Sequence, residues 1–196
     1  MDKVPLVPID SDNMLDLNSV LLSERMVFLM GEVDEESAYS VITKLLYLEA
    51  QNNNDIHLYI NSDGGAVSCG FAIFDTMRII KSPVRTVCIG KASSVASLIL
   101  AGGEIGKRAA TEHSRIMIHE PYGGHVGSAT DSRIYVEHLN QLKETFITIL
   151  SKLTNKPEEV IERDIRRDKY MTAVEAKDYG IIDCILKGDK GGSCVY

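Results

Sequence analysis

The sequence predicts an α/β domain built from parallel strand–helix units. Two apolar, β-branched runs, at residues 55–61 and 84–90, end close to glycines, and each leads into an apolar helical pattern. A strand, a glycine turn and a helix in that order, occurring twice in succession, is typical of parallel βα units. With 196 residues, of which 44% are hydrophobic, the chain is long enough for one domain with a sizeable core.

The elements before the first glycine turn begin near Arg25. Residues 25–31 have the composition of a strand, and Asp34 caps a helix that we expect to run to residue 51. The predicted buried face of that helix comprises Ala38, Val41, Leu45 and Leu48. Residues 1–20 contain two prolines and little periodicity, so we expect an arm or loop there.

The turn at Gly64 and Gly65 leads into a helix over residues 66–81. The strand at 84–90 then precedes a short helix from about Ser94 to Ala101, and another strand covers 114–120.

The longest helical pattern covers residues 129–154. A shorter helix is expected to start at Pro157 and end at about Arg167. Thr172 and Glu175 form a capping box, and Gly180 ends that helix before a last strand at 181–186. We therefore expect an N-terminal arm at 1–20, one domain at 21–187 and a tail without periodicity at 188–196.

Composition disfavours several classes of function. The net charge is -7 and the charges are mixed, so the chain lacks the basic run that would predict nucleic-acid binding. It contains neither an apolar window of about eighteen residues, as a membrane span requires, nor the pattern of an export signal. The cysteines are widely spaced without a CxxC pair, which favours reduced thiols over a zinc site or a disulfide framework. They are Cys69, Cys88, Cys184 and Cys194.

Candidate catalytic residues are ambiguous on local evidence. Ser94 sits at a strand-to-helix junction, where serine is most simply a helix cap but is also a possible exposed nucleophile. Among five histidines, His119 stands out because it closes a strand just before a proline. Asp168 lies where a helix gives way to a loop, and a solvated ion pair with Arg167 or Lys169 is the simplest expectation for it.

Four motifs resolve this ambiguity by their order along the chain. They are LYINSDGGAVSCGFAIFDTM, CIGKASSVASLILAGGEIGKR, SRIMIHEPYGG and IRRDKYMTAVEAKDYGIID. Together they resemble the ClpP family, the proteolytic core of ATP-dependent Clp proteases, over roughly residues 21–187. The resemblance implies a ClpP/crotonase-like fold of stacked ββα units, with a protruding handle helix after His119.

The resemblance also implies a serine endopeptidase and its site residues. Ser94 matches the nucleophile, His119 the base and Asp168 the carboxylate, with 119 − 94 = 25 residues between the first two, as in the family. The oxyanion hole falls on the backbone N–H groups of Gly65 and Val95. The resemblance implies no metal and no cofactor for this chain. ATP is used by the partner ATPase, not by this chain.

The implied partners follow from the same family. Two stacked seven-membered rings, a tetradecamer, would enclose the sites and receive unfolded proteins from a Clp ATPase chaperone. These rings contain one chain type or two. Tyr59 matches a position in the docking surface for that ATPase, although a strand aromatic at a subunit contact is an equal alternative. Bacterial cytoplasm is the expected compartment, with plastid stroma as the alternative.

The chain departs from the family pattern at several positions. Asp63 stands where proline is usual and Glu120 where glutamine is usual, so we expect effects on rate and preference rather than on reaction type. Arg166 replaces a usual acidic residue, which predicts either a weaker contact between rings or a different partner chain across that contact. The β-branched side chain of Val95 is expected to reshape the pocket beside the nucleophile.

Two other functions compete with the peptidase. A divergent paralogue can act as a catalytically weak scaffold or regulatory subunit of a mixed Clp ring. The second competitor is a CoA-thioester enzyme of the crotonase type, which commonly relies on paired glutamates. The serine, histidine and aspartate at peptidase spacing favour the peptidase.

Overall fold

A seven-stranded sheet forms the centre of the computed structural model, which describes residues 5–8 and 14–188. The strands β3, β4, β5, β6 and β9 are neighbours in that order, while β7 pairs with β5 on one side and β8 on the other. Every pairing in this sheet is parallel except β7 with β8. The strands are β3 (Met26–Val33), β4 (Ile56–Gly65), β5 (Val84–Ser93), β6 (Arg108–Thr111), β7 (Arg115–Ile118), β8 (Lys169–Thr172) and β9 (Cys184–Leu186).

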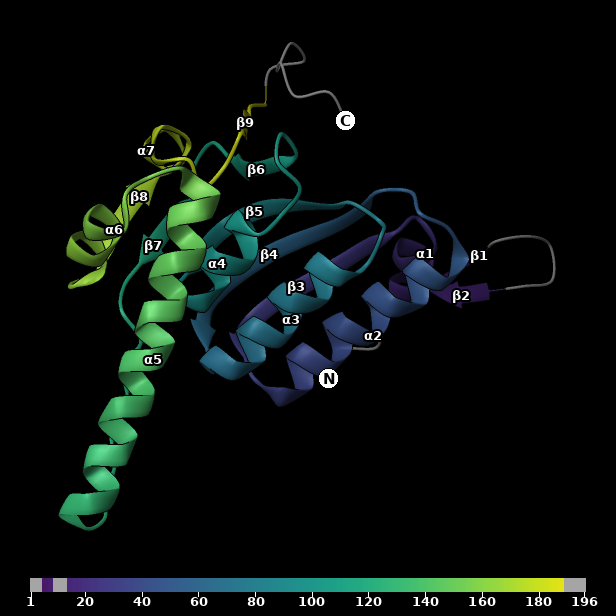
Figure 1. Cartoon of the computed structure of the whole chain (residues 1–196). Coiled ribbons are helices and arrows are strands. Elements are labelled where there is room, and N and C mark those ends of the chain that lie inside the picture. The colour runs from purple at the N-terminus through teal and green to yellow at the C-terminus, as the bar shows by residue number, and fades with distance from the viewer. Residues whose placement is uncertain (1–4, 9–13, 189–196) are drawn as a thin grey trace.

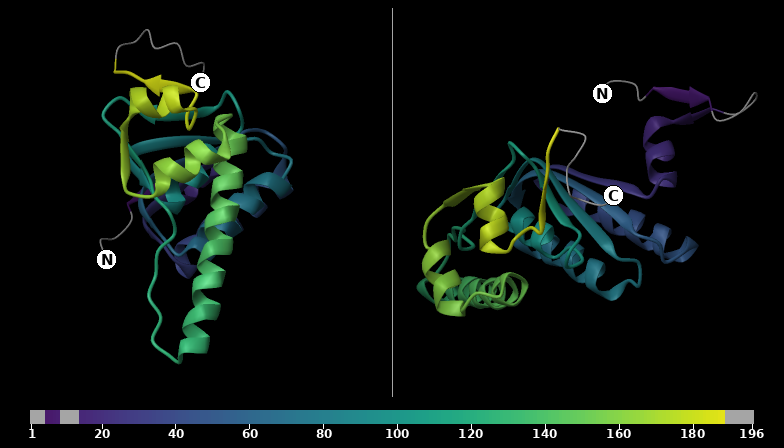
Figure 2. Two further views of the ribbon diagram at one scale, coloured as in Figure 1. Left: turned by 60° about the vertical axis from the view of Figure 1, so that its left-hand side comes forward. Right: turned by 90° about the horizontal axis from the view of Figure 1, so that it is seen from above.

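Three helices cover one face of this sheet, and a fourth, longer helix projects beyond it (Figure 1). The helices α2 (Glu35–Gln51), α3 (Val67–Ile79) and α4 (Val95–Ala101) pack side by side against the parallel strands (Figure 2). Helix α5 (Ala129–Thr154) packs against α4, and its N-terminal half projects away from the body (Figure 1). The expected ClpP/crotonase-like α/β fold with a protruding helix is therefore confirmed. The C-terminal helices are α6 (Glu158–Ile165) and α7 (Ala173–Tyr179).

Local signals account for several helix ends. The Asp34 carboxylate accepts from the Ser37 N–H at 2.8 Å, and the Ser37 hydroxyl accepts from the Asp34 N–H at 2.9 Å. Thr172 and Glu175 form the predicted capping box, and Gly180 ends α7 in the left-handed conformation, with φ 96°. The predicted apolar face of α2 is buried.

Other elements differ from the sequence-based expectation. The N-terminal region contains β1 (Leu6–Pro8), which pairs antiparallel with β2 (Met14–Asp16), and then α1 (Leu17–Ser23). Figure 2 shows β1 and β2 lying away from the seven-stranded sheet, whereas α1 contacts β3. The strands β6 and β8 were not predicted, and β9 starts later than expected. Strands of three or four residues are too short to show a period, so pairing partners determine them.

The cysteine expectation needs one correction. Cys69 and Cys88 are free, but Cys184 is disulfide-bonded, and Cys194 lies outside the described residues. Cysteine spacing does not reveal which thiols the fold brings together, so reduced thiols were the wrong prediction for Cys184. Within the described ranges, no helix is both long enough and apolar enough to cross a membrane.

A buried ion pair ties the C-terminal half of the fold to the sheet. The Arg108 guanidinium binds the Asp183 carboxylate through Nε at 2.9 Å and Nη2 at 2.6 Å. Its Nη1 also donates to the carbonyls of Ala101 and Leu153, which close α4 and lie near the end of α5. Burial raises the pKa of Asp183, but the hydrogen bonds from Arg108 outweigh it, so the net pKa lies below its ordinary value.

Replacing Asp183 by alanine should lower the free energy of unfolding by about 3–5 kcal/mol, because it leaves the Arg108 charge buried without its counter-ion. Since folding lowers the pKa of Asp183, this contribution is complete above the unfolded pKa of about 3.9 and is lost as pH falls through the folded pKa. Urea unfolding between about pH 3 and 7 measures both effects. The control is Glu162→Ala, which removes an exposed pair with Arg166 and should cost less than about 0.5 kcal/mol. Equal losses in the two variants would contradict this expectation.

Candidate active site

Ser94 occupies a strained turn between two buried elements. It follows the last residue of β5 and precedes α4, with φ 56° and ψ −130°, in a region that L-residues rarely adopt. Its N–H donates to the Met117 carbonyl at 2.9 Å, which fastens the turn to β7. The serine side chain makes no cap hydrogen bond to α4. The simple interpretation of Ser94 as a helix cap is therefore wrong, and its hydroxyl points elsewhere.

That hydroxyl reaches His119. The distance from Ser94 Oγ to His119 Nε2 is 2.9 Å, and His119 Nδ1 lies 3.0 Å from Asp168 Oδ1. The His119 side chain is 15% exposed and that of Asp168 is 53% exposed, so the chain of groups runs from the interior to the surface. Lys169, an alternative partner for Asp168, instead pairs with Asp164 at 3.2 Å. The structure thus brings together the three residues singled out in the sequence.

Sheet pairing explains why these residues meet. Ser93 pairs with Met117 across the parallel β5–β7 contact, and Ile118 pairs with Lys169 across the antiparallel β7–β8 contact. Ser94, His119 and Asp168 are each the next residue along from one of these pairs. Three segments far apart in sequence therefore end at one edge.

Two glycines allow β4 to pass close to the nucleophile. Gly64 has φ 93°, and a Cβ there would lie 2.7 Å from both the Ser93 carbonyl oxygen and the Ser94 Cβ. A Cβ at Gly65, φ 153°, would lie 2.3 Å from the Val33 carbonyl oxygen. Only glycine fits either position, because both the backbone conformation and the space exclude a side chain.

The residue after the nucleophile faces inward. The Val95 side chain is 1% exposed, and a Cβ on Gly70 of α3 would lie 2.0 Å from Val95 Cγ2. The β-branched side chain therefore fills the space that Gly70 leaves open within the core. The expected effect of the Val95 side chain on the pocket beside the nucleophile is not seen, because the side chain packs between α3 and α4 and does not line the groove.

A groove begins beside this cluster. It has a volume of about 600 Å³ and lies between the start of α3 and the projecting part of α5, with Gly65 and Tyr122 among its lining residues. The Tyr122 ring meets the His119 ring edge-on, with 5.3 Å between centroids. The sequence had not singled out Tyr122, which is 81% exposed. Apolar side chains from both helices, including Val67, Phe71, Leu139 and Leu142, share the rest of the lining with the polar side chains of Ser68, Asp75, Tyr135 and His138.

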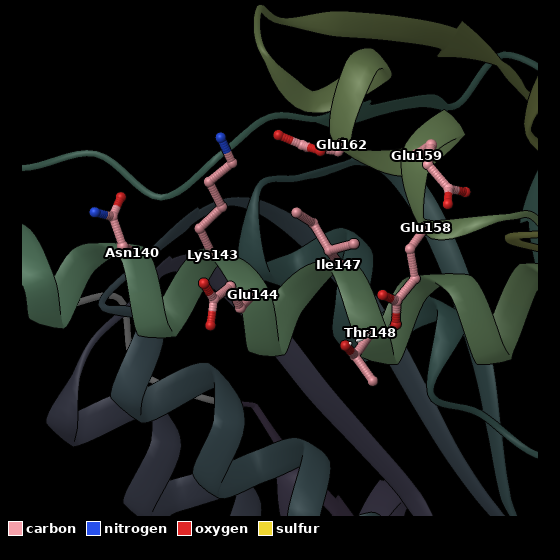
Figure 3. A pocket seen from close by; sticks show the side chains of 8 residues that line it. All are labelled: Asn140, Lys143, Glu144, Ile147, Thr148, Glu158, Glu159 and Glu162. Atoms are coloured by element: carbon pink, nitrogen blue, oxygen red, sulfur yellow. Dashed lines mark hydrogen bonds between the residues drawn. The ribbon is translucent and has the colours of Figure 1, made fainter.

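A second hollow, of about 500 Å³, lies between α5 and α6 and contains none of the predicted site residues (Figure 3). Lys143 and four glutamates, among them Glu158 and Glu162, line it. Across the described part of the chain, no group of three or more histidine, cysteine or acidic side chains is arranged to hold a metal ion.

Comparison with known families agrees with this geometry. The sequence profile described as Clp protease matches residues 10–189. The chain belongs to the Clp protease family. That match extends over the whole seven-stranded sheet and the helices around the cluster, so the fold and the family agree.

The departures from the usual Clp protease pattern have partners within the chain. Asp63 pairs with Lys91 at 2.5 Å, and both side chains are exposed. Glu120 pairs with Lys143 at 2.8 Å, and Arg166 lies 3.7 Å from Glu162. The unusual charges are therefore balanced locally. The two lysines could not be found from the sequence, because a lone lysine carries no signal of a partner 28 or 23 residues away.

Tyr59, the candidate for ATPase docking, stacks on Phe28. Their ring centroids are 5.3 Å apart with an interplanar angle of 18°, and the two residues pair directly across β3 and β4. This contact gives the ring a structural role within the sheet, and its role in docking stays a prediction.

Replacing Gly70 by alanine should destabilise the protein by about 1–3 kcal/mol, because the added methyl overlaps Val95 and overpacks the core. The gain in helix propensity, about 1 kcal/mol, offsets only part of this cost. Thermal unfolding followed by circular dichroism measures the loss.

The second variant, Val95→Ala, makes room for the new methyl. In the double variant, the cost of Gly70→Ala should therefore be smaller than in the wild-type background. Simple additivity of the two substitutions would show that the overlap with Val95 is not the cause.

Proposed function

We propose that this chain is a serine endopeptidase, the proteolytic subunit of an ATP-dependent Clp protease. The observation that carries the proposal is the continuous contact from Ser94 Oγ through the His119 ring to the Asp168 carboxylate, at 2.9 and 3.0 Å. A nucleophile, a base and a group that orients the base at these distances are the requirements of acyl transfer. Family membership supports the same chemistry.

The proposed reaction begins with proton transfer to His119. Nε2 accepts the Ser94 proton as Oγ attacks the peptide carbonyl, while Asp168 holds Nδ1–H and stabilises the imidazolium. His119 then gives the proton to the leaving amine, which departs and leaves an ester on Ser94. A water molecule, deprotonated by His119, then attacks this ester. As the ester bond breaks, His119 returns the proton to Ser94 Oγ, which restores the free serine and releases the new carboxyl end.

The oxyanion of the tetrahedral intermediate needs two donors. We assign them to the backbone N–H groups of Gly65 and Val95, which flank the serine from β4 and from the chain itself. A donor on the residue after a strained nucleophile is a recurring arrangement in hydrolases. The close approach of Gly64 to Ser94 supports the first donor.

The groove beside Gly65 is the proposed site for a substrate side chain. Its lining by Val67, Phe71, Leu139 and Leu142 favours an apolar residue on the acyl side of the scissile bond. The exposed approach along Tyr122 suits an extended, unfolded chain.

The proposed assembly is that of the family. Rings of one or two chain types, stacked as a tetradecamer, would receive unfolded proteins from a Clp ATPase chaperone, which alone uses ATP. Bacterial cytoplasm, with plastid stroma as the alternative, fits an activity that depends on an ATPase.

Labelling with a fluorophosphonate probe tests whether Ser94 is activated. The size-fractionated protein should be modified at Ser94 alone, as peptide mapping would show, and Ser94→Ala should not react. The neighbouring Ser97→Ala is a control, because the Ser97 hydroxyl donates to the Ser94 carbonyl rather than to His119. Absence of labelling in a ring-sized fraction would contradict the proposal and favour a scaffold subunit.

Replacing Asp168 by asparagine should lower kcat/KM for a fluorogenic peptide by about 10³-fold or more, because the amide favours the wrong tautomer of His119. The melting temperature should change little, since Asp168 is half exposed. Unchanged hydrolysis in this variant would show that the carboxylate does not act on His119.

A further inference from the structure

Glu120 directly follows the catalytic base candidate His119 and contacts two other parts of the fold, α5 and the end of α6. We propose that Glu120 is a positioning residue, and that its ion pair with Lys143 of α5 holds His119 in line with Ser94 and Asp168. This inference rests on the proposed peptidase function. It concerns a charged contact at a position where a neutral glutamine is usual in the family.

The contact is partly buried and well formed. A Glu120 oxygen lies 2.8 Å from Lys143 Nζ, and the two side chains are 35% and 25% exposed. The Glu120 N–H also donates to the Ile165 carbonyl at 2.7 Å. Ile165 ends α6, three residues before Asp168. Glu120 is therefore fixed to α5 by its side chain and to the segment that carries Asp168 by its backbone.

His119 needs such an anchor because regular pairing stops before it. The β7 ladder ends at Ile118, and residues 119–127 contain no helix or strand. The chain beyond Glu120 is open to solvent, with Tyr122 81% and Val126 100% exposed. Without the contacts of Glu120, the backbone at His119 would be held only through β7, on its N-terminal side. Catalytic groups need placement within about 0.5 Å, so a loose base lowers the rate.

The surroundings direct Lys143 toward Glu120. Lys143 and Glu162 reach toward the same space between α5 and α6 (Figure 3). Glu162 has its own partner in Arg166, and Glu158 accepts a hydrogen bond from Thr148 at 2.9 Å. The negative charges around this hollow also stabilise the ammonium. A charged acceptor at Glu120 binds it more strongly than a neutral amide would, since charge-assisted hydrogen bonds are roughly twice as strong.

The consequence is a mechanical link between the projecting helix and the catalytic base. A shift of α5 that carries Lys143 away would release Glu120, and with it the backbone at His119. The link acts on the alignment of the site rather than on binding of the substrate, since neither residue lines the groove beside Gly65.

The test compares the rate of Ser94 labelling by a fluorophosphonate probe in the full chain, with kinact and KI measured separately. Lys143→Met and Glu120→Ala should each lower kinact about tenfold, a fraction of what a 1 Å misplacement can cost, and leave KI and the melting temperature unchanged. Lys143→Arg, which keeps the charge, should restore most of the rate. Lys152→Met, an exposed lysine of the same helix, is the control and should behave as wild type.

The double variant Glu120→Ala, Lys143→Met decides whether the two residues act together. It should react no more slowly than either single variant, because each substitution already breaks the same contact. Additive losses, unchanged kinact in both single variants, or a loss in kinact that follows a fall in melting temperature would overturn the inference. In each of these cases Ser94 of the wild-type protein is still labelled. Failure of labelling in the wild type itself overturns the peptidase proposal and this inference together.

Discussion

The pairing of β7 with two neighbours is the constraint on which the site depends. This four-residue strand lies parallel to β5 and antiparallel to β8, and the contacts at Met117 and Ile118 set the register on both sides. A shift of one residue in either pairing would turn the side chains to the opposite face of the sheet. The distances of 2.9 and 3.0 Å from His119 to Ser94 and Asp168 are thus a consequence of strand register.

The strained backbone at Ser94 is maintained by the core around it. A residue in such a conformation costs about 1–3 kcal/mol, and it persists only where the surroundings determine it. Here the Met117 carbonyl holds the Ser94 N–H, and every residue of α4 is buried. The fit of Val95 against Gly70 belongs to the same arrangement. The surrounding contacts therefore offset the cost of the strained backbone at Ser94. In this conformation the Ser94 hydroxyl faces His119.

The unusual carboxylates near the cluster each have a cationic partner, although the chain as a whole has a net charge of -7. Asp63 and Glu120 each bring a carboxylate close to the cluster, and each faces a lysine from a different segment. The first pair is exposed and contributes little to stability, whereas the second is shielded enough to fix a backbone position. The same kind of departure from the family pattern thus has two different physical consequences, which depend on burial.

The sequence by itself determined the parallel strand–helix units, the buried face of α2, and the caps at Asp34 and Thr172. These features depend on periodicity and on residues three or four positions apart, so local pattern suffices. The motifs around Ser94, His119 and Asp168 identified the candidate residues through their resemblance to a family. Only the tertiary structure decided that the Ser94 hydroxyl faces His119 instead of capping α4. It also decided the short strands β6 and β8, the disulfide state of Cys184, and the lysines that meet Asp63 and Glu120. All of these depend on contacts between segments far apart in the chain, for which neighbouring residues carry no signal.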